Sequence, residues 1–411
     1  MVLEGFTLNG SMANAITDLP SGMVFSGAVY SLLVAAIASF VASLLIVATQ
    51  AWHGKLSLDN DVTGIQKCHK TPVPRVGGIA LLFGMLAVLL LESLEYVHVT
   101  NHTHLDAFIK LLIAGMPAFA AGLLEDLTKK VSVTARLIAT ITSAVLASML
   151  LGAYLPRLDV WGLDDLLQLA PFAVVVTAIA VAGVANSINI IDGFHGVAGS
   201  TVVIILAGLG YLAWQQGDEF LTKIAFLGLG ATLGFLLVNY PSGRLFMGDG
   251  GAYFLGFWLA EVAVLLVLRN PAVNAWQVLA VCAYPIIEVL YSIYRRTVIR
   301  KVSPGAPDRL HLHTLVHRRL VYRIVAARAD QPWIRNAAVA CVLASWIATT
   351  TFIAVAVGGT IAAAIGIVVM EVLLYMAVYA RLVRGHWSLH RRPHMEIHGE
   401  PLGKLSMRKS R

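Results

Sequence analysis

The sequence predicts an all-α polytopic membrane protein with about eleven transmembrane helices, and two properties of the chain carry this prediction. Of the 411 residues, 58% are hydrophobic and 13% are charged, whereas an ordinary soluble domain has about 25% charged residues. Apolar runs of about 20 residues recur along the chain, and a helix of that length crosses about 30 Å of hydrocarbon. We therefore expect lipid to surround most of the protein.

The expected spans follow these apolar runs in order. They lie at residues 24–50, 77–98, 106–124, 137–155, 171–186, 197–214, 221–240, 251–268, 277–294, 336–356 and 360–380. Together they predict one membrane domain over residues 24–382, after a short segment 1–23 and before a basic tail 383–411. Residues 1–23 contain Glu4 and Asp18 but no Lys or Arg, which is the wrong charge for a cleaved secretory signal.

The Lys and Arg residues predict how the spans are oriented. With the N-terminus outside, the inner segments are 51–76, 125–136, 187–196, 241–250, 295–335 and 381–411, and they hold 26 of the 30 Lys and Arg residues. The positive-inside rule therefore predicts a periplasmic N-terminus and a cytoplasmic C-terminus. This distribution also explains the net charge of +7 without a nucleic-acid partner, because the basic residues are not interleaved with aromatic ones on a soluble module.

Five polar segments fall on the expected cytoplasmic face. The first, residues 59–78, contains Asp61, Lys67 and His69 before a Gly-Gly pair that opens a helix. Cations beside a helix N-terminus favour phosphate. Taken alone, this segment is better explained as an ordinary positive-inside loop.

The second segment places Glu125 and Asp126 at the end of an apolar run, with Lys129 one turn later. Adjacent carboxylates at a membrane boundary bind Mg²⁺ or take a proton from a substrate. The alternative is a plain helix end with i,i+3 and i,i+4 ion pairs.

The third segment repeats polar residues every three positions, at Asn186, Asn189 and Asp192, and continues to His195. Such groups are costly at the edge of the hydrocarbon unless they have partners, so a functional role is favoured over hydrogen bonding between helices.

In the fourth segment Asp249 lies among glycines that start a new apolar helix. Glycines let backbone N–H groups approach a phosphate, and a carboxylate binds a hard cation. A capping Asp in a glycine-rich turn is the structural alternative.

The fifth segment carries Arg309, His311 and His313 in the longest inner loop. The histidine spacing is irregular for zinc, and basic donors for a diphosphate are the more natural role. A solvated basic loop is again the alternative.

In this order, the five segments resemble the polyprenyl-phosphate N-acetylhexosamine-1-phosphate transferases over residues 24–382. The resemblance implies transfer of a HexNAc-1-phosphate from a UDP-sugar to undecaprenyl phosphate, with release of UMP, in the bacterial inner membrane. It implies Mg²⁺ as cofactor, with Mn²⁺ as a substitute. The product would be undecaprenyl-diphosphate-HexNAc, which begins a surface glycan of the O-antigen, common-antigen or capsule type.

The resemblance also assigns roles to individual residues. It implies that Asp249 is a metal ligand, with Asn189 or Asp192 close to the metal. The expected catalytic residues are Glu125, Asp126, Asp192 and Asp249, and the expected substrate-binding residues are Asp61, Lys67, His69, Lys129, Asn186, Asn189, His195, Arg309, His311 and His313.

Three positions depart from the family pattern. Glu125 stands where Asp is usual, His195 where a second acid is frequent, and Thr314 where a histidine ends the histidine motif. The first loop and the His-x-His pattern favour the antigen-initiating branch over the phospho-MurNAc-pentapeptide branch. The expected sugar is therefore GlcNAc or a modified HexNAc.

Several alternatives remain open from the sequence. The prenyl phosphate attacks the UDP-sugar directly, or the reaction passes through an aspartyl phosphate at Asp192 or Asp126. A transporter that uses intramembrane carboxylates such as Glu288, or an inactive scaffold of the same fold, is the functional alternative. The expected partners are the UDP-HexNAc, undecaprenyl phosphate and the lipid bilayer, and a homodimer is left open.

Overall fold

Long apolar helices make up most of the computed structural model, which describes residues 21–59, 72–95, 103–303, 308–326, 331 and 333–384. Ten of the described helices are long and apolar enough to cross a membrane. They are α1 (Ser21–Ala48), α3 (Gly77–Glu95), α4 (Thr103–Thr128), α5 (Val133–Leu151), α7 (Ala170–Ile191), α8 (Val197–Gln215), α9 (Glu219–Asn239), α10 (Gly248–Arg269), α15 (Trp333–Val357) and α16 (Ile361–Arg384). The prediction of an all-α, multi-pass membrane protein is confirmed at this level.

Short elements connect these helices. They are α2 (Gln50–Ser57), β1 (Leu58–Asp59), β2 (Val73–Pro74), α6 (Leu163–Leu167), α11 (Ala275–Val281), α12 (Ala283–Tyr294), the π-helix η1 (Arg295–Ile299), α13 (Leu312–Leu315), the π-helix η2 (Val316–Val321) and α14 (Tyr322–Ile324). The strands β1 and β2 pair antiparallel, with Leu58 opposite Pro74 and Asp59 opposite Val73. The apolar runs of the sequence do not predict this ribbon.

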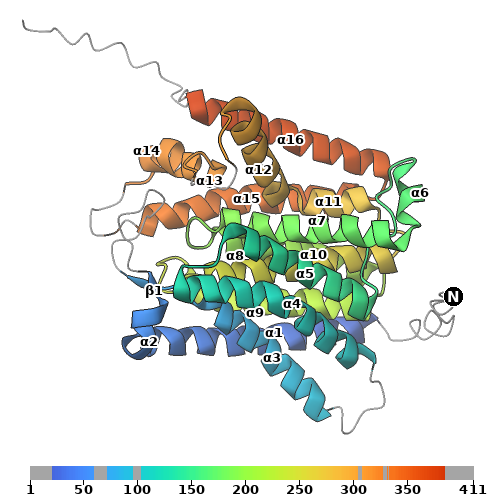
Figure 1. The fold of residues 1–411 in the computed structure, drawn as a ribbon, viewed down its shortest axis with the longest axis horizontal. Helices are drawn as coiled ribbons and strands as arrows, with labels where there is room; N and C mark the ends of the chain where they lie inside the picture. Colours follow the sequence, from blue (N-terminus) through green and yellow to red (C-terminus); the bar gives the residue numbers. More distant parts are fainter. Residues whose placement is uncertain are drawn as a thin grey trace, which may run out of the picture.

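The predicted span 277–294 is not one continuous helix. It breaks at Cys282, and α11 meets the stretch Ala283–Ile299 at an angle of 81°. Pro285 has no N–H to donate to the carbonyl of Val281, so it fits the first turn of a new helix better than the middle of an old one. Figure 1 shows α12 running across the direction of the long helices.

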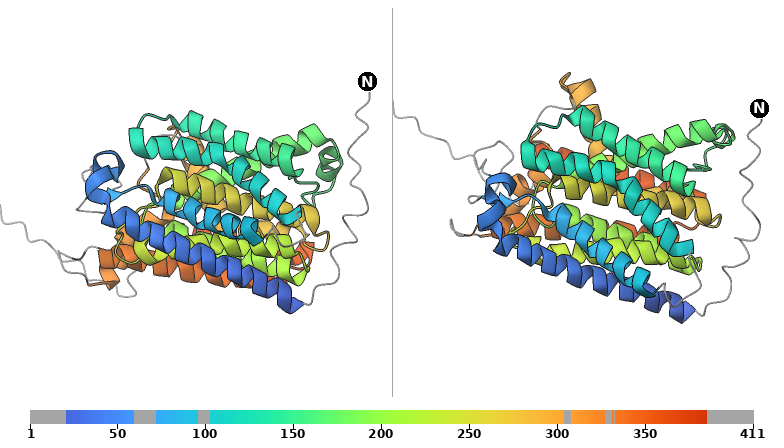
Figure 2. Two further views of the ribbon diagram at one scale, coloured as in Figure 1. Left: turned by 90° about the horizontal axis from the view of Figure 1, so that it is seen from below. Right: turned by 60° about the horizontal axis from the view of Figure 1, so that its bottom comes forward.

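The helix α10 forms the centre of the bundle. It packs against α4, α7, α3 and α8, and its aromatic side chains Phe254, Phe257 and Trp258 are fully buried. Figure 2 shows α4 and α5 side by side along one face, with α1 along the opposite side. The amino end of α10 is therefore surrounded by the ends of other helices.

The motif-bearing loops gather at one end of the bundle. Figure 1 shows α2, β1, α13 and α14 at the same end, with α6 at the opposite end. This arrangement agrees with the prediction that the polar segments share one face. Which side of the membrane that end faces stays a prediction from the Lys and Arg distribution.

Candidate active site

Asp249 lies in the first turn of α10, where the chain approaches α4 and the loop before α3. Gly248 has a φ of +74°, a left-handed conformation that favours glycine. A Cβ added to Gly122 of α4 would lie 2.5 Å from the backbone of Asp249 and Gly250. Glycine at these two positions lets the two backbones meet and places Asp249 beside α4.

The carboxylate of Asp126 holds this turn from α4. Its Oδ1 accepts from the backbone N–H of Asp249 and its Oδ2 from that of Gly250, both at 2.9 Å. The first N–H groups of a helix have no partner within the helix, and a carboxylate there also interacts favourably with the helix dipole. Asp126 is 2% exposed, so it fixes the position of Asp249 as well as being a candidate catalytic group.

Three donors from other elements converge on the Asp249 side chain. Arg75 Nη2 lies 3.2 Å from Oδ1, Arg136 Nη1 contacts Oδ2, and Asn189 Nδ2 donates to Oδ1 at 3.1 Å. Arg75 Nη2 is also 3.5 Å from Asp126 Oδ1. The structure thus brings Asp126, Asn189 and Asp249 together, as the motifs predict.

Arg75 and Arg136 contact Asp249 but are not among the predicted site residues. Arg75 is one of the cations of the first segment, which was interpreted as a candidate anion site without a role for Arg75 itself, and Arg136 was counted only as a positive-inside charge. Arg75 directly precedes the Val-Gly-Gly that opens α3, and Arg136 follows Ser132, whose side chain caps α5. The position beside a helix start was the available signal.

Asp192 lies at the C-cap of α7 and is influenced electrostatically by Arg75, Asp126 and Asp249. Burial raises the pKa of its carboxyl group to about 7; the Arg75 guanidinium opposes this shift, whereas the Asp249 and Asp126 carboxylates add to it. Asp192 and Asp249 therefore share one electrostatic environment, although they are far apart in sequence.

The other predicted residues of the second and third segments have separate places. Glu125 Oε2 accepts from the backbone N–H of Val131 at 2.8 Å and closes the turn after α4, where Lys129 has a left-handed φ of +57°. The helix α7 continues to Ile191, five residues beyond the predicted end at 186, so Asn186 lies inside it and is partly buried. Their roles toward a substrate stay predictions.

His195 lies at the start of α8 and contacts α15. Its Nε2 is 3.3 Å from the carbonyl oxygen of Trp333, and a Cβ added to Gly243 would lie 2.8 Å from its Nδ1. Burial lowers the pKa of His195, and the carbonyls of Trp333 and Pro241 partly oppose this shift. These contacts add a structural role to the predicted one.

The histidine loop, which is the part of the fifth segment that carries His311 and His313, reaches the third segment through His313. A Cβ added to Gly193, next to Asp192, would lie 2.5 Å from His313 Nε2. The rings of His311 and His313 are nearly parallel, with centroids 5.4 Å apart. Burial lowers the pKa of His313 to about 4, so this imidazole is neutral at pH 7. The loop is thus adjacent to the segment that carries Asp192.

The remaining predicted residues are one exposed arginine and three residues that the structure does not describe. Arg309 is exposed, and Asp61, Lys67 and His69 lie outside the residues that the structure describes. The predicted roles of these four residues therefore stay predictions.

The magnesium ion that the motifs imply stays a prediction. In the described ranges no group of three His, Cys, Asp or Glu side chains could hold a metal ion. Mg²⁺, however, is usually bound by one or two carboxylates together with substrate phosphates and water. Asp249 supplies one such carboxylate, whereas Asn189 faces it with its NH₂ group, so the ligand roles of Asn189 and Asp192 stay predictions.

A bundle of apolar helices with carboxylates, guanidiniums and imidazoles at one end defines a multi-pass membrane protein with a site suited to phosphate groups. Residues 108–267 match the sequence profile of glycosyl transferase family 4, and the resemblance predicted from the motifs is confirmed. The matched stretch includes Asp126, Asn189, Asp192 and Asp249.

Three relatives illustrate the similarity. The chain is 27% identical to a probable undecaprenyl-phosphate N-acetylglucosaminyl 1-phosphate transferase of Bacillus subtilis (strain 168), over 62% of this chain and 68% of that protein. It is 29% identical to the undecaprenyl-phosphate alpha-N-acetylglucosaminyl 1-phosphate transferase of Yersinia pestis, over 63% and 69%. It is 27% identical to the decaprenyl-phosphate N-acetylglucosaminephosphotransferase of Mycobacterium tuberculosis (strain CDC 1551 / Oshkosh), over 62% and 69%. The predicted enzyme class, a transferase of substituted phosphate groups, is confirmed by these relatives.

Proposed function

We propose that this protein transfers a HexNAc-1-phosphate, from UDP-GlcNAc or a UDP-linked modified HexNAc, to undecaprenyl phosphate. The products are UMP and undecaprenyl-diphosphate-HexNAc, which initiates a cell-surface glycan at the bacterial inner membrane. The observation that carries the proposal is the Asp249 carboxylate at the amino end of α10, in contact with Arg75, Arg136 and Asn189. The names of the relatives support the lipid and sugar classes.

The charges around Asp249 suit a diphosphate. Two guanidiniums and a helix N-terminus attract phosphate oxygens, and a guanidinium binds two of them at once. Asp126 and Asp249 would repel the same anion if they acted alone. When bound by Asp249 with Asn189 or Asp192, Mg²⁺ would offset this repulsion and neutralise charge on the diphosphate.

The chain's own residues then serve mainly to position the reactants. A phosphate oxygen of the lipid attacks the β-phosphorus of the UDP-sugar, the bond from that phosphorus to the bridging oxygen breaks, and UMP leaves with the electron pair. Arg75 and Arg136 would hold the diphosphate in line with the attacking oxygen. Because both oxygens of Asp126 accept backbone N–H groups, a covalent intermediate at Asp126 is disfavoured relative to direct attack.

The test is transfer of radiolabel from a panel of UDP-HexNAc donors to undecaprenyl phosphate by the purified protein, with EDTA or with added Mg²⁺ or Mn²⁺. We expect lipid-linked product that requires the metal and is lost in Asp249→Asn. The matched control is Asp165→Asn, the same change at an exposed residue of α6 at the opposite end of the bundle. A folded protein that makes no product with any donor would contradict the proposal and favour the scaffold or the transporter.

A second assay separates the two routes of transfer. Exchange of labelled UMP into UDP-sugar without lipid acceptor requires a covalent intermediate, because only then does UMP leave before the acceptor reacts. We expect no such exchange. Exchange that disappears in Asp192→Asn would instead support the aspartyl-phosphate route.

A further inference from the structure

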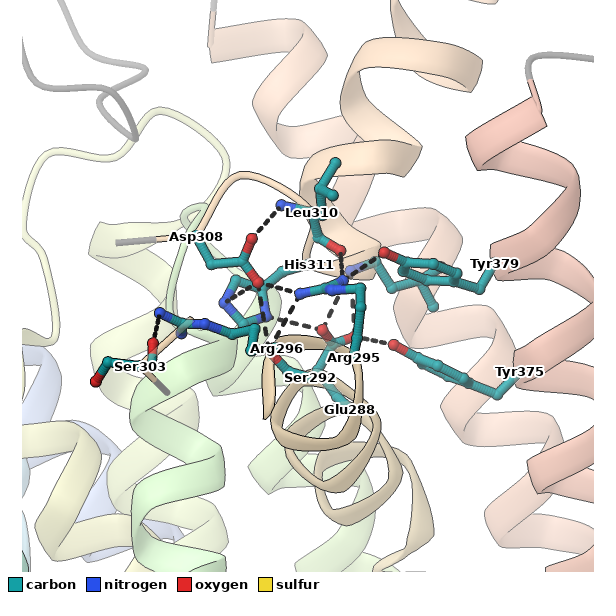
Figure 3. Close-up of polar contacts among 11 residues, drawn as sticks. Glu288, Ser292, Arg295, Arg296, Ser303, Asp308, Leu310, His311, Tyr375 and Tyr379 are labelled. Carbon is teal, nitrogen blue, oxygen red and sulfur yellow. Dashed lines mark hydrogen bonds and ion pairs between the residues drawn. The ribbon is translucent and has the colours of Figure 1, made fainter. Parts of the chain in front are cut away.

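A buried carboxylate on α12 holds the histidine loop from behind. Glu288 is 1% exposed and accepts from His311 Nδ1 at 2.9 Å, from the backbone N–H of Leu312 at 3.2 Å and from the Tyr375 hydroxyl at 2.9 Å. Figure 3 shows these contacts joining α12, the loop and α16. A carboxylate buried this deeply is tolerated because several donors satisfy it.

A second buried pair fastens the preceding part of the loop. Arg295 contacts the Asp308 carboxylate and the Tyr379 hydroxyl, and its Nη1 donates to the carbonyl of Leu310 at 2.6 Å. Burial alone would raise the pKa of Asp308, but the Arg295 guanidinium holds it below its usual value. The carboxylate of Asp308 is thus ionised and paired at neutral pH.

The bend at Cys282 makes these contacts possible. After the 81° break, Glu288 and Arg295 lie two turns apart on one side of the helical stretch, and both are buried. Leu290 and Tyr294, on other sides of the stretch, are exposed. The polar side of α12 and η1 therefore faces the loop instead of lipid.

The partner of each His311 nitrogen follows from this geometry. An ionised carboxylate only accepts hydrogen bonds, so His311 Nδ1 carries the proton that it donates to Glu288. Nε2, which is 3.8 Å from Asp308 Oδ2, is then the ring nitrogen left to meet a substrate. The stacked neighbour His313 contacts Gly193, next to Asp192.

We propose that Glu288, supported by Tyr375, is a positioning residue that fixes the tautomer and orientation of His311 at the transfer site. This inference rests on the proposed function together with the predicted role of His311 in substrate binding. Glu288 acts by orienting the His311 ring, and its bond to the Leu312 N–H holds the backbone that carries this ring, so its loss misplaces the imidazole and lowers turnover.

The test is a double-mutant cycle on transfer from UDP-GlcNAc to undecaprenyl phosphate. Glu288→Gln keeps the size of the side chain but removes its charge, and we expect kcat to fall about 10- to 100-fold, the loss typical of a misplaced reacting group. In a His311→Ala background the same substitution should change kcat by less than about twofold, because the residue through which it acts is gone. Equal losses in both backgrounds would overturn the proposal.

Milder variants test the proposal if Glu288→Gln does not fold. Tyr375→Phe removes one of the donors to Glu288, and we expect kcat to fall about 2- to 10-fold, as loss of one hydrogen bond predicts. The matched control is Tyr284→Phe on α12, because the buried Tyr284 hydroxyl has no hydrogen-bond partner among the described residues. Equal effects of the two changes would contradict the proposal.

Glu371→Gln is the corresponding carboxylate control. Glu371 is 2% exposed on α16, but it forms a hydrogen bond with Thr350 and not with the histidine loop. We therefore expect the kcat of Glu371→Gln to stay near that of the unmodified protein. If the unmodified protein makes no product, the proposed function fails. If it is active and Glu288→Gln is fully active, only the positioning inference fails.

Discussion

The Asp126 carboxylate on α4 accepts the backbone N–H of Asp249 at 2.9 Å, although 123 positions separate the two residues. A second bond of equal length joins Asp126 to Gly250. The amino end of α10 is thereby attached to the end of α4, and the Asp249 side chain is directed toward Arg75, Arg136 and Asn189. These two hydrogen bonds therefore fix the position of Asp249 relative to α4.

Asp126→Asn should therefore impair both stability and transfer. One oxygen becomes an NH₂ group that faces a backbone N–H, which leaves a buried donor unsatisfied at a cost of about 1–3 kcal/mol. We expect a lower midpoint in thermal unfolding and at least about 10-fold lower kcat. Glu125→Gln is the comparison, since Glu125 accepts a single bond from Val131 in a more exposed turn. An equal drop in stability for both variants would contradict this account.

Arg136→Lys should weaken binding of the UDP-sugar although it conserves charge. Lysine is a point charge and lacks the planar fork that binds two phosphate oxygens. We expect KM for the donor to rise about 10-fold, the effect of about 1.4 kcal/mol. Lys130→Ala, which removes an exposed charge from the turn that precedes α5, should leave KM within about twofold. Steady-state kinetics over a donor concentration series measures both, and an unchanged KM in Arg136→Lys would refute the role.

Gly193→Ala should lower transfer by displacing His313. The added Cβ would lie 2.5 Å from His313 Nε2, so the His313 ring must move away from the segment that carries Asp192. We expect kcat to fall about 10- to 100-fold. Gly183→Ala, within α7, meets no atom within 4 Å and should retain full activity, because alanine favours a helix. Full activity of both variants would show that this contact is dispensable.

Acidification should destabilise the fold partly through His313. Burial lowers its pKa from an ordinary value of 6.5 to about 4 in the folded protein, so below pH 6.5 the unfolded chain binds a proton that the folded chain does not. Stability from this group is full above pH 6.5 and is lost as pH falls toward 4, by about 2 kcal/mol at pH 5. Unfolding measured at pH 7 and pH 5 gives the loss.

His313→Gln is the control for this pH effect. Burial also lowers the pKa of His195 and His317, so these residues leave a residual pH dependence in the variant. The variant should lose less stability than the unmodified protein between pH 7 and pH 5. An identical loss in both proteins would show that His313 does not contribute.

The sequence alone determined the class of fold and the composition of the site. The length of an apolar run is set by the thickness of the hydrocarbon that it crosses, and the distribution of Lys and Arg is set by membrane insertion. Both constraints act on each segment separately, so most spans were predicted within a few residues. The same distribution placed Asp126, Asn189, Asp192 and Asp249 at one end of the bundle, where the structure brings them into one cluster.

Only the tertiary structure decided which groups pair there. No local pattern predicts that Arg75 and Arg136 pair with Asp249, or that His311 bonds to Glu288. A transmembrane helix is apolar on all sides, so its sequence does not report which side meets a neighbour. The partners of a buried charge are instead chosen by helix packing, since each buried polar group must find donors or acceptors on whichever segments lie beside it.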